Sequence, residues 1–152
     1  MPDHLKDVTY TYKRLLGGYL VALQQTIFAY LEELSSGAVE AQRLHQMLTF
    51  ARQQLCIIPP VDLEHGTAQA QQHFLFTQLH RPLRVCGMVK NAGEPGGGPF
   101  WVAQADGSLS LQIVESSQVD MTSAEQRACF AAATHFNPVD LVCGVRDYRG
   151  QP

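Results

Sequence analysis

The sequence predicts an α+β domain, in which an N-terminal helical hairpin and a third helix precede a small mixed β-sheet with one inserted helix. Three observations favour this class. Apolar residues recur at steps of three and four through the first third of the chain. Short apolar or alternating segments follow Pro82, and Asp106-Gly107 between two of them is a strong hairpin signal. Thr122-Ser123-Ala124-Glu125 then resembles a capping box before one more helix.

The first helix is predicted from about residue 5 to residue 34. Gly17 and Gly18 weaken it by about 1 kcal/mol each relative to alanine, which predicts close helix packing or a bend at that point. Ser35-Ser36-Gly37 ends the helix, and a second helix of the same spacing at about 38–55 completes the hairpin. The predicted apolar stripe of the first helix consists of Leu5, Val8, Tyr12, Leu15, Tyr19, Leu23, Ile27, Tyr30 and Leu34.

A linker that contains Pro59 and Pro60 ends the first segment, 1–66. The second segment, 67–152, opens with a glutamine-rich helix at 67–80, and both segments are expected to pack as one domain. Strands are predicted at 83–90, 100–103, 109–113 and 139–145, with the inserted helix ending near residue 133. The tetrads VCGM at 85–88 and VCGV at 142–145 share a glycine, which predicts close approach of another backbone or a ligand.

Composition and charge exclude several classes of function. The chain has 152 residues, which suits one domain, and its 11 Lys and Arg against 14 Asp and Glu give a net charge of −3. This balance argues against sequence-independent nucleic-acid binding, which needs a dense basic face. The longest apolar run is too short to span a bilayer. Four cysteines without a CxxC pair or a signal peptide predict a cytoplasmic protein without a disulfide framework.

The glycine-rich loop at 90–101, KNAGEPGGGPFW, is the first candidate site. Three successive glycines allow positive φ and expose backbone N–H groups, which predicts an anion-binding nest. Flanking prolines stiffen the loop, whereas a plain flexible hairpin loop is the alternative. Lysine adds a positive charge, and the glutamate is suited to bind a hydroxyl or a metal. The ligand-binding candidates in this loop are Lys90, Asn91, Glu94, Gly96, Gly97 and Gly98.

Two later polar clusters, at 115–120 and 134–140, complete the candidate site. The first lies at the end of an amphipathic strand, where α/β folds commonly carry binding groups. His135 is predicted at a helix C-terminus, where the helix dipole favours its charged form. The predicted catalytic residues are His135, Glu115 and Asp140, because His135 with either carboxylate would form an acid–base pair. The other candidates are Ser116, Gln118, Asn137 and Arg146 for ligand or phosphate binding and Asp120 for metal binding.

These readings have plainer alternatives. The cluster at 115–120 is also typical of a polar turn, and His135 of a helix cap.

Four segments together resemble an uncharacterised bacterial family, the domain of unknown function number 4301, which is common in Bacteroidetes. They are RVCGMVKN at 84–91, GEPGGGPFW at 93–101, QIVESSQ at 112–118 and HFNPVDLVC at 135–143. The resemblance implies longer members, of which this chain would be a piece, within a larger α/β protein. It also implies a missing N-terminal half that is similar to nucleotide-diphospho-sugar transferases. It brings no catalytic residue with it, so the candidate residues depend on the chemistry of the loops.

The predicted function is therefore the substrate-side portion of a sugar-phosphate nucleotidyltransferase-like enzyme, inactive as an isolated fragment because the nucleotide loop is missing. The expected partners are a phosphorylated small molecule or nucleotide sugar and the missing N-terminal domain, with Mg²⁺ as the expected cofactor. The alternatives are a non-catalytic interaction module that uses the helical hairpin, and a truncated remnant without activity. Lys90, Glu115, His135 and Asp140 in one concave pocket would favour the enzyme. An exposed apolar stripe on the first helix would favour the module.

Overall fold

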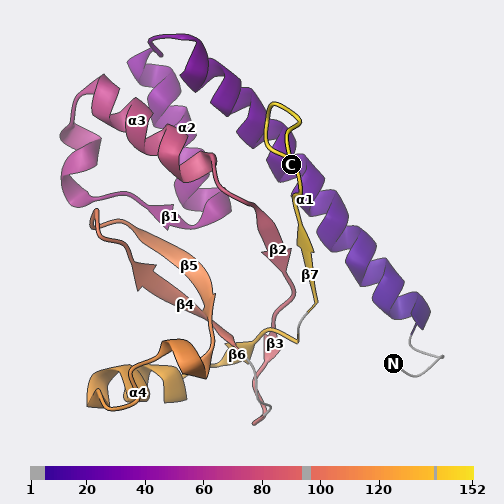
Figure 1. The fold of residues 1–152 in the computed structure, drawn as a ribbon. Coiled ribbons are helices and arrows are strands. Elements are labelled where there is room, and N and C mark those ends of the chain that lie inside the picture. The colour runs from indigo at the N-terminus through magenta and orange to yellow at the C-terminus, as the bar shows by residue number, and fades with distance from the viewer. Residues whose placement is uncertain (1–5, 94–96, 139) are drawn as a thin grey trace.

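Helices and small antiparallel sheets confirm the α+β class in the computed structural model, which describes residues 6–93, 97–138 and 140–152 (Figure 1). The three N-terminal helices end within a few residues of their predicted limits. They are α1 (Lys6–Ser36), α2 (Ala41–Leu55) and α3 (Ala68–Leu79). A short 3₁₀ helix, η2 (Val61–His65), precedes α3. Because α3 packs against both α1 and α2, the helical hairpin and the third helix form one layer.

The core lies among these three helices, and their periodic apolar residues build it. An ion pair between Glu33 and Arg43 and an edge-to-face contact between Tyr30 and Phe50 join α1 to α2 near their connection. Each fully buried leucine contributes about 1.5–3 kcal/mol. The buried cluster consists of Leu23, Ile27, Leu31, Leu34, Leu44, Met47, Leu48, Ala51, Ile57, Phe74, Leu75 and Leu79.

The N-terminal half of α1 departs from the prediction. In the predicted apolar stripe, Leu23, Ile27 and Leu34 are buried and Tyr30 is partly buried. The members exposed to solvent are Val8, Tyr12, Leu15 and Tyr19. None of the described residues lies within 4 Å of a side chain built at Gly17 or Gly18, so close packing among them does not explain this glycine pair. Figure 1 shows this half of α1 extending away from α2 and α3, alongside β2 and β7.

Three separate antiparallel sheets replace the single mixed sheet that the sequence predicts. In the largest, β5 (Leu109–Val114) lies between β1 (Ile57–Ile58) and β4 (Gly98–Ala103). The other two are β2 (Arg84–Cys86) with β7 (Leu141–Cys143), and β3 (Val89–Lys90) with β6 (His135–Phe136).

The predicted strand 83–90 is divided at Gly87. The N–H of Gly87 donates to the carbonyl oxygen of Asp140 at 2.7 Å, and a side chain built at Gly87 would lie 3.3 Å from that oxygen. At Gly144, a side chain would overlap the amide of Gln24 on α1. The glycines of the two similar tetrads therefore do mark close approaches, and the tetrads lie on paired strands.

The inserted helix, α4 (Ala124–Ala131), ends earlier than predicted. Ser123 caps it by accepting a hydrogen bond from the N–H of Gln126, one residue later than the predicted cap at Thr122. His135 consequently does not lie at a helix C-terminus, as the sequence predicted. It lies in β6 because the backbone there pairs with β3, with His135 opposite Lys90.

The hairpin at Asp106-Gly107 is confirmed, and it joins β4 to β5 with Ala103 opposite Leu109. Gly107 adopts a left-handed φ of +79°, which favours glycine. The Asp106 carboxylate accepts hydrogen bonds from the hydroxyl and the N–H of Ser108, and these bonds lower the pKa of Asp106 below its usual value.

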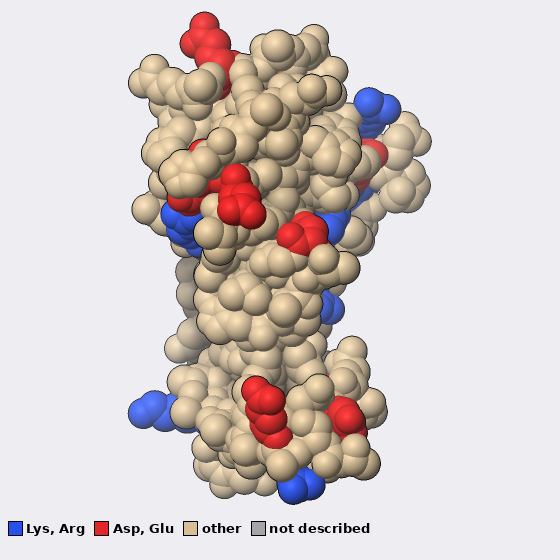
Figure 2. Space-filling view, turned by 90° about the vertical axis from the view of Figure 1, so that its left-hand side faces the viewer, with Lys and Arg blue, Asp and Glu red and all other residues tan. Residues whose placement is uncertain are grey.

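On the face shown in Figure 2, charged side chains lie on the upper and the lower parts, and a band between them is largely uncharged. Within the described ranges, no helix has the length and apolarity needed to cross a membrane.

Candidate functional site

Strand pairing brings several of the predicted site segments together. Lys90 lies opposite His135, and the N–H of Asn91 donates to the carbonyl oxygen of Thr134 at 3.0 Å. The N–H of Asn137 donates to the carbonyl oxygen of Gly97 at 2.8 Å. The glycine loop is therefore connected to the 134–140 cluster through its backbone.

The two described glycines of the triple-glycine turn are buried by close packing. A side chain built at Gly97 would lie 2.6 Å from the Glu115 carboxylate and 2.7 Å from Ile113, and one at Gly98 would lie 3.1 Å from the His135 carbonyl oxygen. Gly98 does not have a positive φ, so the geometry expected for an anion nest is not found at this residue. The Glu115 carboxylate beside Gly97 would also repel a bound anion. Glu94 and Gly96 lie outside the described residues.

The cluster at 115–120 makes its hydrogen bonds locally. Glu115 and Gln118 form a reciprocal cap around η3 (Ser116–Gln118), in which the Gln118 amide oxygen accepts from the Glu115 N–H at 2.9 Å. Asp120 accepts from the hydroxyl of Thr122 at 2.6 Å and from its N–H, and these bonds lower the pKa of Asp120. No group of three His, Cys, Asp or Glu placed to hold a metal occurs among the described residues, so Mg²⁺ binding stays a prediction.

The remaining predicted residues make separate contacts. The His135 ring lies 2.9 Å from the Thr134 hydroxyl, and Asp140 pairs with Lys13 on α1 at 3.4 Å. Arg146 donates to the carbonyl oxygen of Gly150 at 2.8 Å. Asn137 is buried and donates from its amide to the carbonyl oxygen of Gly87 at 2.7 Å. Neither of the two clefts described below is lined by Lys90, Glu115, His135 or Asp140.

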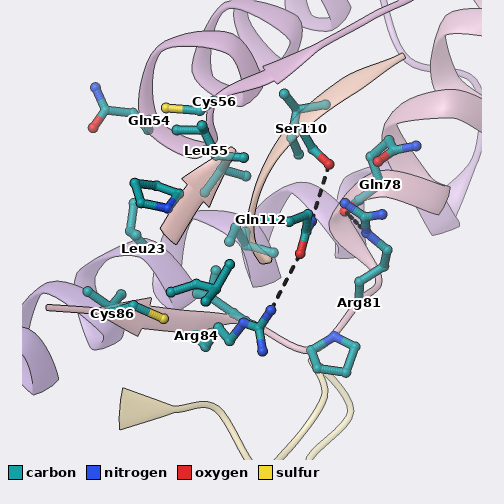
Figure 3. A pocket seen from close by; sticks show the side chains of 18 of the residues that line it. Leu23, Gln54, Leu55, Cys56, Gln78, Arg81, Arg84, Cys86, Ser110 and Gln112 are labelled. Carbon is teal, nitrogen blue, oxygen red and sulfur yellow. Dashed lines mark hydrogen bonds between the residues drawn. The ribbon is translucent and has the colours of Figure 1, made fainter. Parts of the chain in front are cut away.

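A cleft of about 400 Å³ separates α1 and the end of α2 from the chain segment 81–86 and strand β5 (Figure 3). Leu23 and Ile27 of α1 and Leu55 of α2 form part of its apolar wall. We call it the arginine cleft because its polar lining contains two arginines. These polar residues are Gln54, Gln78, Arg81, Arg84, Ser110 and Gln112.

A line of hydrogen bonds positions one of the two arginines. Arg84 donates to the amide oxygen of Gln112 at 3.4 Å, and Gln112 donates to the hydroxyl of Ser110 at 3.2 Å, as Figure 3 shows. Arg81 donates from Nε to the backbone carbonyl oxygen of Gln78 at 3.3 Å. A guanidinium carries five N–H donors, so both arginines keep donors for a ligand.

Arg81 and Arg84 are both exposed. Among the described residues, no Asp or Glu lines the cleft and neither arginine forms an ion pair with a carboxylate. Arg81 does interact weakly with one carboxylate. Its positive charge is the smallest of the causes that lower the pKa of Asp106. Two positive charges beside an apolar wall favour an anionic ligand.

Gln78 provides a second sign of a ligand. It is only 8% exposed, and its amide oxygen is buried without a hydrogen-bond partner in the described part of the chain. A buried polar atom without a partner costs about 1–3 kcal/mol, which a bound polar molecule would recover. Figure 3 shows Gln78 and Arg81 on the same side of the cleft.

The sequence interpretation missed these residues because they form no contiguous motif. Gln78, Arg81 and Arg84 follow one another at three-residue steps from the end of α3 into β2, whereas Gln112 comes from β5. The signal that the sequence offers for this site is the pair Arg81 and Arg84 on either side of Pro82. Two nearby arginines stand out because only 16% of the residues in the chain are charged.

A family model described as domain of unknown function DUF4301 matches residues 1–152. No curated protein and no solved structure matches the chain.

Proposed function

We propose that this chain, which belongs to the DUF4301 family of domains of unknown function, binds a phosphorylated small molecule in the arginine cleft. The observation that carries the proposal is the pair Arg81 and Arg84, without an ion-pair partner among the described residues, in a cleft that none of the described acidic residues lines. Guanidinium groups bind phosphate through charge-assisted and often bidentate hydrogen bonds.

The rest of the arginine cleft suits the uncharged part of such a ligand. Its volume of about 400 Å³ falls in the range of small-molecule sites. Gln78 and Gln112 offer amide donors and acceptors for hydroxyl groups, and the side chains of Leu23, Ile27 and Leu55 would pack on the carbon skeleton. Mixed apolar and polar walls of this kind fix the orientation of a ligand.

The finer function remains the sugar-phosphate nucleotidyltransferase-like activity that the sequence predicts. The arginine cleft would then be the substrate side of that enzyme, where positioning and charge neutralisation do most of the catalytic work. Catalysis by Glu115, His135 and Asp140 and binding of Mg²⁺ are separate predictions, on which ligand binding in the cleft does not depend.

The test is binding of glucose 1-phosphate, measured by titration calorimetry, with inorganic phosphate and glucose as partial probes. Arg84→Gln and Arg81→Gln should each weaken the binding of glucose 1-phosphate roughly tenfold or more, since a hydrogen bond to a charged group contributes about 1.5–3 kcal/mol to the binding free energy. Arg14→Gln, an exposed arginine on α1, is the matched control and should have no effect.

Lys90→Gln separates the arginine cleft from the glycine loop. The cleft proposal predicts unchanged binding, because Lys90 does not line it. Loss of binding in Lys90→Gln with wild-type binding in Arg84→Gln would transfer the phosphate site to the loop and refute the proposal.

A second function, protein interaction, is favoured by the exposed stripe on α1. Val8, Tyr12, Leu15 and Tyr19 are spaced four, three and four residues apart and are 48–64% exposed. Contiguous apolar patches of this kind commonly mark interaction surfaces. If the partner is a second copy of the chain, sedimentation should show concentration-dependent self-association that Leu15→Glu abolishes. Val61→Glu, at an exposed valine of η2, should leave this self-association unchanged.

A further inference from the structure

A second cleft, which we call the C-terminal cleft, lies between α1 and the chain after β7. Its volume is about 220 Å³. Ile27, Phe28 and Leu31 of α1 provide apolar lining, and His80 and residues 144–148 form much of the remaining wall. Arg81 lines both clefts, whereas Arg84 lines only the arginine cleft and Arg146 only the C-terminal cleft.

The rings of His80 and Tyr148 line one side of the C-terminal cleft, and the Phe76 ring packs against both of them. The Tyr148 ring contacts the His80 ring edge to face at 5.4 Å, and the Phe76 ring lies 5.3 Å from His80 and 6.4 Å from Tyr148. These contacts hold Tyr148 in one place, with the guanidinium of Arg149 over its ring at 5.1 Å. The phenolic oxygen of Tyr148 is nevertheless buried without a hydrogen-bond partner within the described ranges. A buried phenol normally finds a partner.

Charged side chains of both signs line this cleft. They are Arg81, Arg146 and Asp147, and Pro152, the last residue of the given sequence, also lines it. The Asp147 carboxylate already accepts hydrogen bonds from the N–H groups of Gln151 and Arg149, at 2.8 and 2.9 Å, and lies 3.9 Å from His80. Hydrogen bonding to the Gln151 N–H is the main reason that the pKa of Asp147 is lowered. Asp147 therefore holds the C-terminal turn together, and Arg146 forms no ion pair with a carboxylate side chain of the described residues.

We propose that the C-terminal cleft binds a small aromatic monocarboxylate of about the size of benzoate. An apolar cavity of about 150 Å³ holds benzene, so a cleft of about 220 Å³ has room for a ring and a carboxylate. The ring would pack on Phe28 and Leu31. The carboxylate would accept hydrogen bonds from the Tyr148 hydroxyl and from Arg146, whose guanidinium uses one donor on Gly150. This proposal does not depend on phosphate binding in the arginine cleft.

The test uses benzoate as the probe and benzyl alcohol as its uncharged analogue, with binding measured by NMR chemical-shift titration. Benzoate should saturate a site that shifts the resonances of Phe28 and Tyr148. Tyr148→Phe and Arg146→Gln should each weaken benzoate binding roughly tenfold. Arg146→Lys should bind benzoate more tightly than Arg146→Gln, because it keeps the positive charge. Arg149→Gln is the matched control, because Arg149 contacts the Tyr148 ring but does not line the cleft.

Tyr148→Phe also separates a ligand-binding role from a structural one. Because it removes a buried unpartnered hydroxyl, it should leave the thermal midpoint of the unliganded protein equal or higher while weakening benzoate. A lower midpoint with unchanged benzoate affinity would overturn the proposal. So would equal affinity for benzyl alcohol and benzoate, or equal effects of Arg146→Gln and Arg149→Gln. Arg84→Gln should change glucose 1-phosphate binding alone, so failure of one site is distinguishable from failure of the other.

Discussion

Asn137→Ala tests whether a predicted ligand-binding residue has a structural role. Asn137 is 8% exposed, and its side-chain amide donates to the carbonyl oxygen of Gly87 at 2.7 Å and lies 3.5 Å from that of Asp140. Its own N–H donates to Gly97. The Asn137 side chain thus connects Gly87, where the chain leaves β2, to the segment between β6 and β7.

The expected destabilisation follows from the short bond. Loss of one hydrogen bond costs about 1 kcal/mol, and leaving the part-buried carbonyl of Gly87 without this donor adds about 1–2 kcal/mol, so we expect about 2–3 kcal/mol in total. For a chain of this size each kcal/mol lowers the unfolding midpoint by about 2–4 °C. The longer contact at 3.5 Å adds little.

Urea denaturation followed by circular dichroism measures this difference. Asn91→Ala is the matched control, because Asn91 accepts a hydrogen bond from the Gly93 N–H in an exposed turn and its loss should cost less than about 0.5 kcal/mol. If Asn137→Ala costs no more than Asn91→Ala, the structural role assigned to Asn137 is wrong. If Asn137→Ala instead weakens the binding of glucose 1-phosphate while the protein stays stably folded, the prediction that Asn137 binds a ligand is supported.

Three further predictions concern packing, pH and thiol reactivity. Gly97→Ala should cost about 1–3 kcal/mol in urea denaturation, because its methyl group would lie 2.7 Å from Ile113. Gly17→Ala, with nothing within 4 Å, should instead stabilise α1 by up to about 1 kcal/mol. Carboxyl NMR titration should find the pKa of Asp106 lowered by its hydrogen bonds with Ser108, and Ser108→Ala should raise it again. Since the folded pKa is the lower one, Asp106 stabilises the turn above the usual Asp pKa, and this contribution is lost as pH falls through the folded value. A thiol reagent should modify exposed Cys129 and Cys143 before Cys86, because burial raises the pKa of the Cys86 thiol; faster reaction of Cys86 would contradict this.

The helices were predictable because each one displays its own periodicity, but the burial of α1 was not. At 1.5 Å per residue, the 31 residues of α1 extend about 46 Å, whereas the 15 residues of α2 and the 12 of α3 extend only about 22 and 18 Å. These two helices bury the stripe from Leu20 onward and leave Val8 to Tyr19 without cover from them. A periodic pattern indicates which face is apolar and does not indicate how much of that face finds a partner.

Strand pairing was predictable only where a turn fixes it. The β4–β5 register follows from Asp106-Gly107, and its limits agree with the prediction to within two residues. By contrast, β6 pairs with β3 across more than forty residues of chain, and nothing local in His135-Phe136 distinguishes a strand from the end of a helix. The division at Gly87 likewise depends on the carbonyl of Asp140, which is remote in the sequence.

The candidate site shows why polar residue type alone is ambiguous. Glu, Asp, Asn and Ser are suited to ligands because their short side chains present oxygen near the backbone, and the same property makes them caps and turn formers. Glu115 caps η3, Asp120 closes a turn with Thr122, and Asn137 binds the backbone of Gly87. Their hydrogen bonds are thus made within the fold. Ligands are more strongly indicated where the fold leaves a need unmet. Here the buried amide oxygen of Gln78 meets that criterion, beside the exposed guanidinium groups of Arg81 and Arg84. The criterion depends on three-dimensional contacts that no local sequence motif encodes.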